Sequence, residues 1–398
     1  MVSLVNAQKI ATLEVSLPKT QSLLDMPVSI ALDPLTFLDG SSLTLSEVIG
    51  SNRAAVPFQV VPGEVRTLHW LVKSELGLKK RVFELAMGKP SDQENITPVL
   101  DDQTLTIKAG NKNLLRYQHG VLDPPAGVDA SYKRSGFIHP LWSPNGQELT
   151  RIHPKDHYHH FGIWNPWTHV LYKGDTVDFW NIGGKKGTVR FANFISTTSG
   201  SVFAEFQALH EHVVTKKNTS EEVAMNELQT IRIYRPEPNQ LYYIVDFTFQ
   251  MNCATENPVT LLEYRYGGFG WRTTEQWNKD NSEVITSEGK ARKEADGTKA
   301  KWCIVQGELD KDYAGAVMMS YPANYNHPEP LRIWPENQYN RGDMFANFAP
   351  TKDKDWILLP GKKYVLKYRM VVFNGKFTQG KAEAAWGTFA APLKVVVK

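Results

Sequence analysis

Alternation of apolar and polar residues dominates the chain and predicts a protein built from β-strands. Successive side chains of a strand point to opposite faces, so alternation marks a strand with one buried face. The alternating segments are rich in β-branched and aromatic residues, are separated by Gly, Pro and Asn, and cover residues 11–17, 65–72, 81–87, 103–109, 188–195, 201–209, 228–235, 241–251, 258–266 and 363–373. Helical periodicity is confined to a short segment at 381–386. The pattern therefore predicts an all-β fold with antiparallel sheets.

One polar, proline-containing segment, KPSDQENITP at 89–98, interrupts this alternation. Such a segment is typical of a linker between domains. We therefore expect a small N-terminal β-sandwich module at residues 1–98 and a large antiparallel β-sandwich domain, with the catalytic function, at residues 99–398. The glycine-rich WNIGGKKGTV at 180–189 lacks the motif and the following helix of a phosphate-binding loop, so a hairpin turn is expected there.

The first residues, MVSLVNAQ, resemble the end of a signal peptide, with the small residues Val5 and Ala7 at the positions that a cleavage site requires. This predicts a periplasmic or secreted protein. The sequence contains no run of about twenty apolar residues, so no transmembrane helix is expected.

Composition narrows the class of partner. The chain has 398 residues and a formal net charge of only +3, which argues against nucleic-acid binding. Cys253 and Cys303 form no C-x-x-C pair, which excludes a zinc ribbon or a redox motif. We expect two free thiols, with a single disulfide as the alternative. The sequence does not give the oligomeric state.

The stretch HPKDHYHHFGIW at 153–164 holds four of the eleven histidines of the chain. If residues 157–161 form a strand, His157 and His159 share one face and His160 lies on the other, unless the chain bends near Gly162. His157 and His159 could then bind a divalent metal, but such sites need a third and usually a fourth ligand, for which only distant residues are available. We therefore expect no required cofactor, with a divalent metal as the alternative.

Acid–base chemistry is the favoured reading of the polar segments at 137–181 and 261–272. Imidazole titrates near neutral pH, a phenol can protonate a leaving oxygen, a guanidinium can bind a carboxylate, and an indole can stack on a sugar ring. The predicted catalytic residues are His139, His157, His159, His160, Tyr264 and Tyr266. The predicted substrate-binding residues are Arg151, Trp142, Trp164, Trp180, Arg265 and Arg272.

This set of side chains suits removal of a proton next to a uronate carboxylate, followed by elimination, as in a lyase or dehydratase. A glycoside hydrolase needs two facing carboxylates, and no two of the available acids stand out in the sequence. A hydrolase, a sugar epimerase and a non-catalytic carbohydrate-binding protein remain the alternatives.

The segments HPLWSPNG, DHYHHFGIW and EYRYGGFGWR resemble motifs of a bacterial family labelled "methane oxygenase PmoA-related". The resemblance extends from Val99 to the end, and its matched positions are His139, Asp156, His157, His159, His160, Trp164 and Arg272. The label suits this chain poorly, because a particulate methane oxygenase is an integral membrane protein. Members of the family often occur among exported proteins of polysaccharide degradation. The resemblance thus implies an exported carbohydrate-active enzyme that acts on oligosaccharides, which we expect to be acidic.

Overall fold

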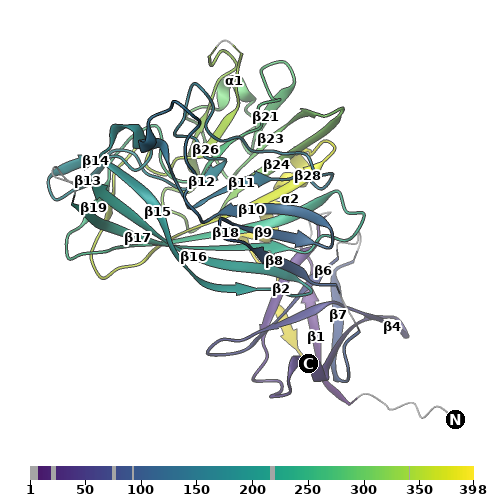
Figure 1. Cartoon of the computed structure of the whole chain (residues 1–398). Coiled ribbons are helices and arrows are strands. Elements are labelled where there is room, and N and C mark those ends of the chain that lie inside the picture. Colours follow the sequence, from purple (N-terminus) through teal and green to yellow (C-terminus); the bar gives the residue numbers. More distant parts are fainter. Residues whose placement is uncertain (1–7, 19–23, 74–77, 92–93, 216–219, 340) are drawn as a thin grey trace. The chain divides into compact units, whose positions relative to one another are not determined.

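The structure is a computed structural model that describes residues 8–18, 24–73, 78–91, 94–215, 220–339 and 341–398 (Figure 1). The predicted signal-peptide residues 1–7 lie outside this part of the chain. Antiparallel strands dominate the described residues, and the all-β fold predicted from the alternation is confirmed. The chain divides into two compact units.

The first unit contains residues up to Ile96 together with Ser199–Phe203 and Glu383–Lys398. Its sheets have the strand orders β29-β1-β7-β3-β4 and β2-β6-β5. The elements are β1 (Lys9–Ser16), β2 (Met26–Ala31), η1 (Gly40–Ser42), β3 (Leu43–Ile49), β4 (Asn52–Ala55), β5 (Phe58–Val61), β6 (Thr67–Val72), β7 (Lys80–Met87) and β29 (Val395–Val397). Alternate residues of these strands point inward and form one core around Trp70 and Phe83.

The predicted domain boundaries need two corrections. The C-terminal strand β29 pairs with β1, with Leu13 opposite Val397, so residues 383–398 belong to the first unit rather than to the large domain. The segment 89–98 is not a linker throughout, because β8 (Ile96–Leu100) lies at the edge of a sheet beside β9 (Thr104–Ala109).

The second unit contains Thr97–Thr198 and Ala204–Ala382. Its two main sheets have the orders β22-β25-β26-β20-β12-β11-β10-β9-β8 and β15-β16-β17-β18-β28-β24-β23-β21, and a small sheet has the order β14-β13-β19-β27. The first main sheet adds β10 (Lys112–Gln118), β11 (Phe137–Leu141), β12 (Ile163–Trp164), β20 (Gly270–Arg272), β22 (Lys299–Ala300), β25 (Glu329–Ile333) and β26 (Phe345–Phe348). The second contains β15 (Gly187–Thr198), β16 (Phe203–Thr215), β17 (Glu221–Tyr234), β18 (Tyr242–Cys253), β21 (Ser282–Thr286), β23 (Trp302–Leu309), β24 (Asp312–Ser320) and β28 (Tyr364–Asn374).

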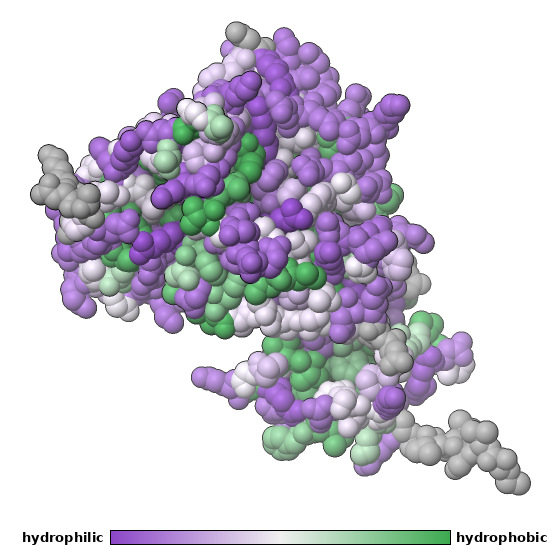
Figure 2. Space-filling view, in the orientation of Figure 1, coloured by the Kyte–Doolittle hydropathy of each residue, from purple (hydrophilic) through white to green (hydrophobic). Residues whose placement is uncertain are grey.

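The two main sheets pack face to face as a sandwich. The Tyr117 ring from β10 lies 4.9 Å from the Phe206 ring of β16, and the Tyr243 hydroxyl of β18 donates a hydrogen bond to the Leu114 carbonyl of β10. Hydrophilic residues cover most of the visible face of this unit, as expected when the apolar half of each alternating strand points inward (Figure 2).

The remaining elements of the second unit are short. They are η2 (Ala130–Tyr132), β13 (Val170–Tyr172), β14 (Asp175–Val177), η3 (Ile182–Gly184), β19 (Val259–Leu261), α1 (Arg292–Ala295) and β27 (Trp356–Leu358); α2 (Gln379–Ala390) runs into the first unit and contains the predicted helix at 381–386. The predicted hairpin turn at 180–189 is wrong, because η3 joins β14 and β15, which lie in different sheets. The strand predicted at 258–266 ends at Leu261, and the following residues are irregular.

Two other expectations concern simple properties of the chain. Cys253 and Cys303 are both buried free thiols, as predicted. None of the helices in the described part of the chain combines the length and the apolar character that crossing a membrane requires.

Candidate functional site

The histidine-rich segment forms a compact loop rather than the predicted strand. The His157 amide donates to the Pro154 carbonyl at 2.8 Å, and the His160 amide donates to the His157 carbonyl at 3.0 Å, which are the contacts of two successive turns. The side chains of these residues therefore do not alternate between two faces. One nitrogen of each of His157, His159 and His160 lies within 4.8 Å of the others.

The three imidazoles surround a common point. Their ring centroids are separated by 5.2 Å between His157 and His159, 4.8 Å between His157 and His160, and 4.9 Å between His159 and His160. His157 and His159 are half-buried, whereas His160 is only 1% exposed. The cluster is thus buried at His160 and partly open at His157 and His159, which form its rim.

Gly162 holds the C-terminal end of this loop against the sheet. Its φ of 60° lies in the left-handed region, and a Cβ at this position would lie 2.2 Å from the Ile138 carbonyl oxygen. Its amide also donates to the Arg151 carbonyl at 2.9 Å. The close approach of β11 and the loop therefore requires a residue without a side chain.

We expect Gly162→Ala to lower the free energy of unfolding by at least about 2 kcal/mol, because it adds a backbone clash to the strain of positive φ. Gly174→Ala is the matched control, since φ is 87° there and no heavy atom lies within 4 Å of the added Cβ. Urea unfolding of both variants measures the difference. Equal losses in the two variants would contradict the role given to the Ile138 contact.

Burial keeps the inner histidines uncharged. It lowers the pKa of His159 to about 4, with smaller contributions from the charges of His157 and Arg272. Burial also lowers the pKa of His160 far below its ordinary value, and the Arg272 charge acts in the same direction. At neutral pH both imidazoles therefore carry a free nitrogen lone pair.

A hydrogen-bonded chain runs from Asp156 through His157 to Tyr339. The His157 Nδ1 atom lies 2.9 Å from the Asp156 carboxylate, and its Nε2 atom lies 2.9 Å from the Tyr339 hydroxyl. Burial raises the pKa of Asp156, but the His157 hydrogen bond and the Arg272 charge lower it more, so that it lies well below its usual range. The ionised carboxylate fixes the orientation of the ring, and Tyr339, 49% exposed, brings the chain to the surface.

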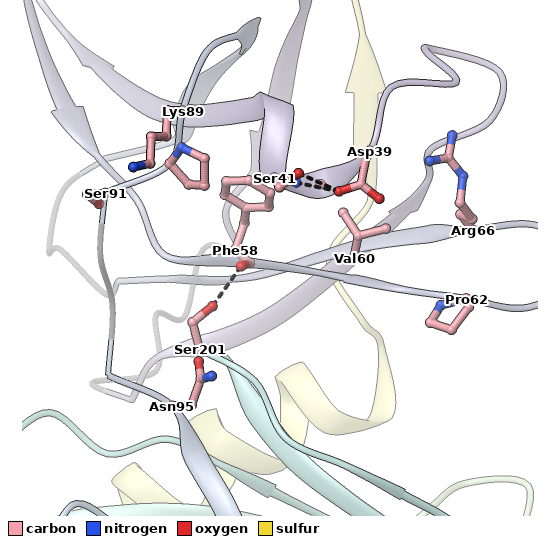
Figure 3. A pocket seen from close by; sticks show the side chains of 12 residues that line it. Asp39, Ser41, Phe58, Val60, Pro62, Arg66, Lys89, Ser91, Asn95 and Ser201 are labelled. Carbon is pink, nitrogen blue, oxygen red and sulfur yellow. Dashed lines mark hydrogen bonds between the residues drawn. The ribbon is translucent and has the colours of Figure 1, made fainter.

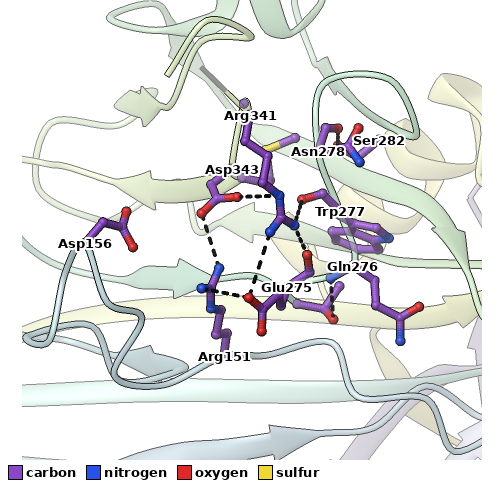
Figure 4. Close-up of polar contacts among 12 residues, drawn as sticks. Arg151, Asp156, Glu275, Gln276, Trp277, Asn278, Ser282, Arg341 and Asp343 are labelled. Carbon is purple, nitrogen blue, oxygen red and sulfur yellow. Dashed lines mark hydrogen bonds and ion pairs between the residues drawn. The ribbon is translucent and has the colours of Figure 1, made fainter. Parts of the chain in front are cut away.

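Arginines and carboxylates form a network beside Asp156 (Figure 4). The Asp343 carboxylate accepts from Arg272 at 2.7 Å and from Arg151 at 3.2 Å, and Arg341 approaches it at 3.3 Å. The Arg151 guanidinium also reaches Glu275 at 3.1 Å. Arg272 is buried and already paired with Asp343, so it is not open to a substrate carboxylate. Arg151 is partly exposed and lies beside the histidines, so it can still bind one.

The prediction that Trp142, Trp164 and Trp180 stack on a sugar is wrong, because all three side chains are buried. Trp164 and Trp180 are each 2% exposed and pack with Trp334 and Phe345 in an apolar cluster. Trp164 lies 5.3 Å from the His160 ring, so these indoles form the wall behind the histidines and offer no face to a sugar. Trp142 is also buried, under the Arg116 guanidinium.

The other predicted catalytic residues do not join the cluster. The His139 Nδ1 atom lies 2.9 Å from the Thr150 hydroxyl oxygen and forms a hydrogen bond with it. Burial lowers the pKa of His139 to about 4. Tyr264 packs on His169, and Arg265 is exposed and lies over Tyr264. The Tyr266 hydroxyl accepts hydrogen bonds from Arg332 at 3.1 Å and from Trp334 at 3.0 Å, so it supports the wall of the site.

Tyr339 and Trp334 belong to the site, although no pattern in the sequence indicates them. The Tyr339 hydroxyl is separated from its partner His157 by 182 residues along the chain, and its segment has no alternation or motif. Nothing in the sequence distinguishes Asp343 from the other acids. Its place among three arginines depends on the pairing of β20 with β26, which brings Arg272 opposite Phe345.

The first unit contains a separate cavity of about 620 Å³, lined in part by Phe58, Val60 and Lys89 (Figure 3). Its Asp39 carboxylate accepts from the Ser41 hydroxyl at 2.7 Å, and Ser201 donates to the Phe58 carbonyl at 2.7 Å. Two of the polar side chains that line the cavity, Asp39 and Ser201, are thus already paired, and no histidine or cysteine is among its lining residues.

Comparison with known proteins identifies the family. A family model described as "Family of unknown function (DUF6807)" matches residues 104–387, so the chain belongs to this family. No curated protein matches the sequence. The resemblance to the PmoA-related family stays a prediction.

Two solved structures from Enterococcus faecalis are similar to the chain. One is described as an alpha-mannosidase and has a TM-score of 0.49; the other is described as a protein in the glycosyl hydrolase family 38 and has a TM-score of 0.47. Both are 8% identical in sequence and are matched over 99% of this chain. The chain spans about half the length of each, 47% and 49%, and the similarity carries no information about its activity.

Proposed function

We propose that this protein is an enzyme that moves a proton on a saccharide, with the exposed end of the Asp156–His157–Tyr339 chain as its catalytic group. The single observation that supports the proposal is the Tyr339 hydroxyl, 2.9 Å from the His157 Nε2 atom and open to solvent. The substrate class comes from the sequence resemblance, and the reaction class comes from this hydrogen-bonded chain.

The reaction that fits best is elimination from an acidic saccharide. Tyr339 takes the proton from the carbon next to the carboxylate as its own proton passes to His157, and the electron pair left on that carbon forms a C=C bond. The C–O bond to the leaving group breaks, its oxygen takes a proton from Tyr339, and His157 returns to Tyr339 the proton that it had accepted. Burial raises the pKa of Tyr339, so the phenol is protonated at neutral pH and depends on His157 as its acceptor.

The arginine network supplies the group that would bind the carboxylate of the substrate. Glu275 is 68% exposed and contacts Arg151 at 3.1 Å and Arg341 at 3.9 Å. A substrate carboxylate can replace this exposed side chain without leaving a buried charge unpaired. Arg341 is also close to the catalytic group, since its amide donates to the Tyr339 carbonyl.

The carboxylates near the site do not suit the hydrolase mechanism. Asp156 and Asp343 both approach one Arg272 nitrogen, at 3.6 Å and 2.7 Å. A glycosidase needs one protonated acid of raised pKa, whereas the pKa of Asp156 is lowered. We therefore keep elimination as the main proposal and hydrolysis as the outcome that product analysis would reveal.

The test is incubation of the protein with uronate oligosaccharides while the ultraviolet absorbance of an unsaturated uronate is followed. We expect this absorbance to rise, and we expect Tyr339→Phe to lower kcat by about 10²–10⁴-fold, the usual contribution of a general acid–base group. Tyr158→Phe is the matched control, because Tyr158 lies beside His157 in the histidine loop but packs on Tyr132.

Product analysis separates the alternatives. Sugars released without the unsaturated product would identify a hydrolase and contradict elimination. An inverted sugar centre without cleavage would identify an epimerase. Binding of oligosaccharides without any turnover, unchanged in Tyr339→Phe, would identify a carbohydrate-binding protein and overturn the proposal.

A further inference from the structure

We propose that His157, His159 and His160 bind a divalent transition-metal ion, with zinc as the expected occupant. Each histidine contributes one ring nitrogen. The catalytic meaning of the ion rests on the function proposed above, but its binding does not.

The geometry is close to that of a three-histidine metal centre. One nitrogen of each ring lies within 4.8 Å of the other two. Three imidazole nitrogens bound to tetrahedral zinc lie roughly 3.4 Å apart, with zinc–nitrogen distances of about 2.0–2.1 Å. Small rotations of the half-buried His157 and His159 side chains therefore close the site on an ion, while the buried His160 stays in place.

The hydrogen bonds of the cluster prepare it for a cation. The His157 Nδ1–H group donates to the Asp156 carboxylate at 2.9 Å, which leaves the lone pair on Nε2. A carboxylate behind a metal-binding imidazole is a recurrent arrangement, because it fixes the tautomer and makes the other nitrogen more basic. The Nδ1 atom of His160 is buried and has no hydrogen-bond partner among the described residues, so the imidazole is incompletely satisfied without a ligand.

The nature of the ligands selects the kind of metal. Imidazole nitrogen suits zinc, copper, nickel and iron, whereas calcium and magnesium need oxygen. The nearest carboxylate, Asp156, is held by His157 and lies 3.6 Å from Arg272, so it is not free to join an oxygen site. Three histidines with an open rim leave a coordination position for water or substrate, as in catalytic zinc sites.

The positive charge of Arg272 works against a cation, and the network beside it offsets this charge. The guanidinium lies 2.7 Å from Asp343 and 3.6 Å from Asp156, with its face over Trp334. The two carboxylates thus offset part of this charge, although it still acts on His159 and His160.

An ion at this position would also change the role of Tyr339. Its hydroxyl lies 2.9 Å from the His157 nitrogen that would bind the metal, so it would lie next to the ion. A nearby divalent cation stabilises a phenolate as it stabilises hydroxide. With its Nε2 lone pair on the ion, His157 would no longer accept the Tyr339 proton, and the charge of the ion would instead help Tyr339 to release it.

The experiment measures metal binding without any substrate. The full chain is treated with a chelator, zinc is added, and bound zinc is measured by mass spectrometry together with the melting temperature; cobalt is added in parallel for its visible absorption band. We expect stoichiometric zinc, a raised melting temperature and the intense band of low-coordinate cobalt. His159→Gln and His160→Gln should lose all three signals, and Asp156→Asn should weaken zinc binding about 10–100-fold.

His119→Gln is the matched control, because His119 contacts the Asp101 carbonyl and lies outside the cluster. Its zinc binding should equal that of the unmodified protein. If His160→Gln fails to fold because this residue is buried, His159→Gln, at a half-buried position, still tests the proposal. No bound zinc in the unmodified protein, or equal binding in His159→Gln, would overturn the metal site.

Tyr339→Phe keeps the two proposals apart. This variant should bind zinc fully and lose turnover. Metal binding without activity on any saccharide would refute the proposed function alone, whereas activity in a protein that binds no zinc would refute the metal site alone.

Discussion

Replacing Arg292 by Met should lower the free energy of unfolding by about 3–5 kcal/mol. Arg292 begins α1 and is 2% exposed. Its guanidinium donates to the carbonyl oxygens of Trp334 at 2.9 Å, Gly342 at 2.7 Å and Asp343 at 2.8 Å. Methionine fills similar space but leaves these buried acceptors without donors, and each unsatisfied acceptor costs about 1–3 kcal/mol.

The same substitution should impair the site, because Arg292 holds both ends of the segment that carries Tyr339. Trp334 precedes this tyrosine, and Gly342 follows it. Burial lowers the pKa of Arg292 to about 10, so the guanidinium is still charged at neutral pH and its hydrogen bonds are charge-assisted. We expect turnover to fall together with stability.

Chemical unfolding of Arg292→Met, Arg292→Lys and Lys293→Met measures this effect. Lysine keeps the charge but cannot reproduce the fork of the guanidinium, so it should recover only part of the loss. Lys293 is the exposed neighbour in α1, and its replacement should change stability by less than about 0.5 kcal/mol. Similar values for Arg292→Met and Lys293→Met would show that the three hydrogen bonds contribute little.

The strands could be predicted because their signal is local. Alternation within a segment such as 228–235 reports which side chains point inward, and the structure places residues 228–234 in β17. The pairing of β29 with β1 could not be predicted in the same way. It joins opposite ends of the chain, and no pattern within residues 383–398 names the partner.

The candidate site could be located from the sequence, but its geometry could not. The histidines of 153–160 drew attention by their number, yet the assumption of a strand put His160 on the wrong side. Turn hydrogen bonds at Pro154 and His157 bring it back to the others. Composition also cannot distinguish an exposed tryptophan from a buried one, which is why Trp164 and Trp180 were predicted as platforms and form a wall instead.

Glu329→Gln should remove a pH dependence of stability that the unmodified protein shows between about pH 4.5 and pH 7. Glu329 lies on β25 with no exposed surface and accepts hydrogen bonds from Ser320 at 2.6 Å, Asn324 at 2.8 Å and Tyr368 at 2.8 Å. Burial raises its pKa to about 7, although these three donors act in the opposite direction. The folded protein therefore holds a proton that the unfolded chain has already lost in this range.

The direction of the effect follows from this difference in proton binding. The raised pKa of Glu329 contributes about 3 kcal/mol to the free energy of unfolding. This contribution is fully present below about pH 4.5, falls as the pH rises, and is lost above about pH 7. Glutamine has no proton to lose, and its amide nitrogen can donate to the Tyr368 oxygen in place of the present contact. The variant should therefore be more stable than the unmodified protein at pH 8 by about 1–3 kcal/mol.

The measurement is the difference in unfolding free energy between Glu329→Gln and the unmodified protein at several pH values. The buried histidines also titrate, but they are the same in both proteins and cancel in the difference. Their lowered pKa values act in the opposite sense, since they cost stability as the pH falls below their ordinary range. A difference that stays constant from pH 5 to pH 8 would show that Glu329 is already ionised in the folded protein, and that its three donors outweigh its burial.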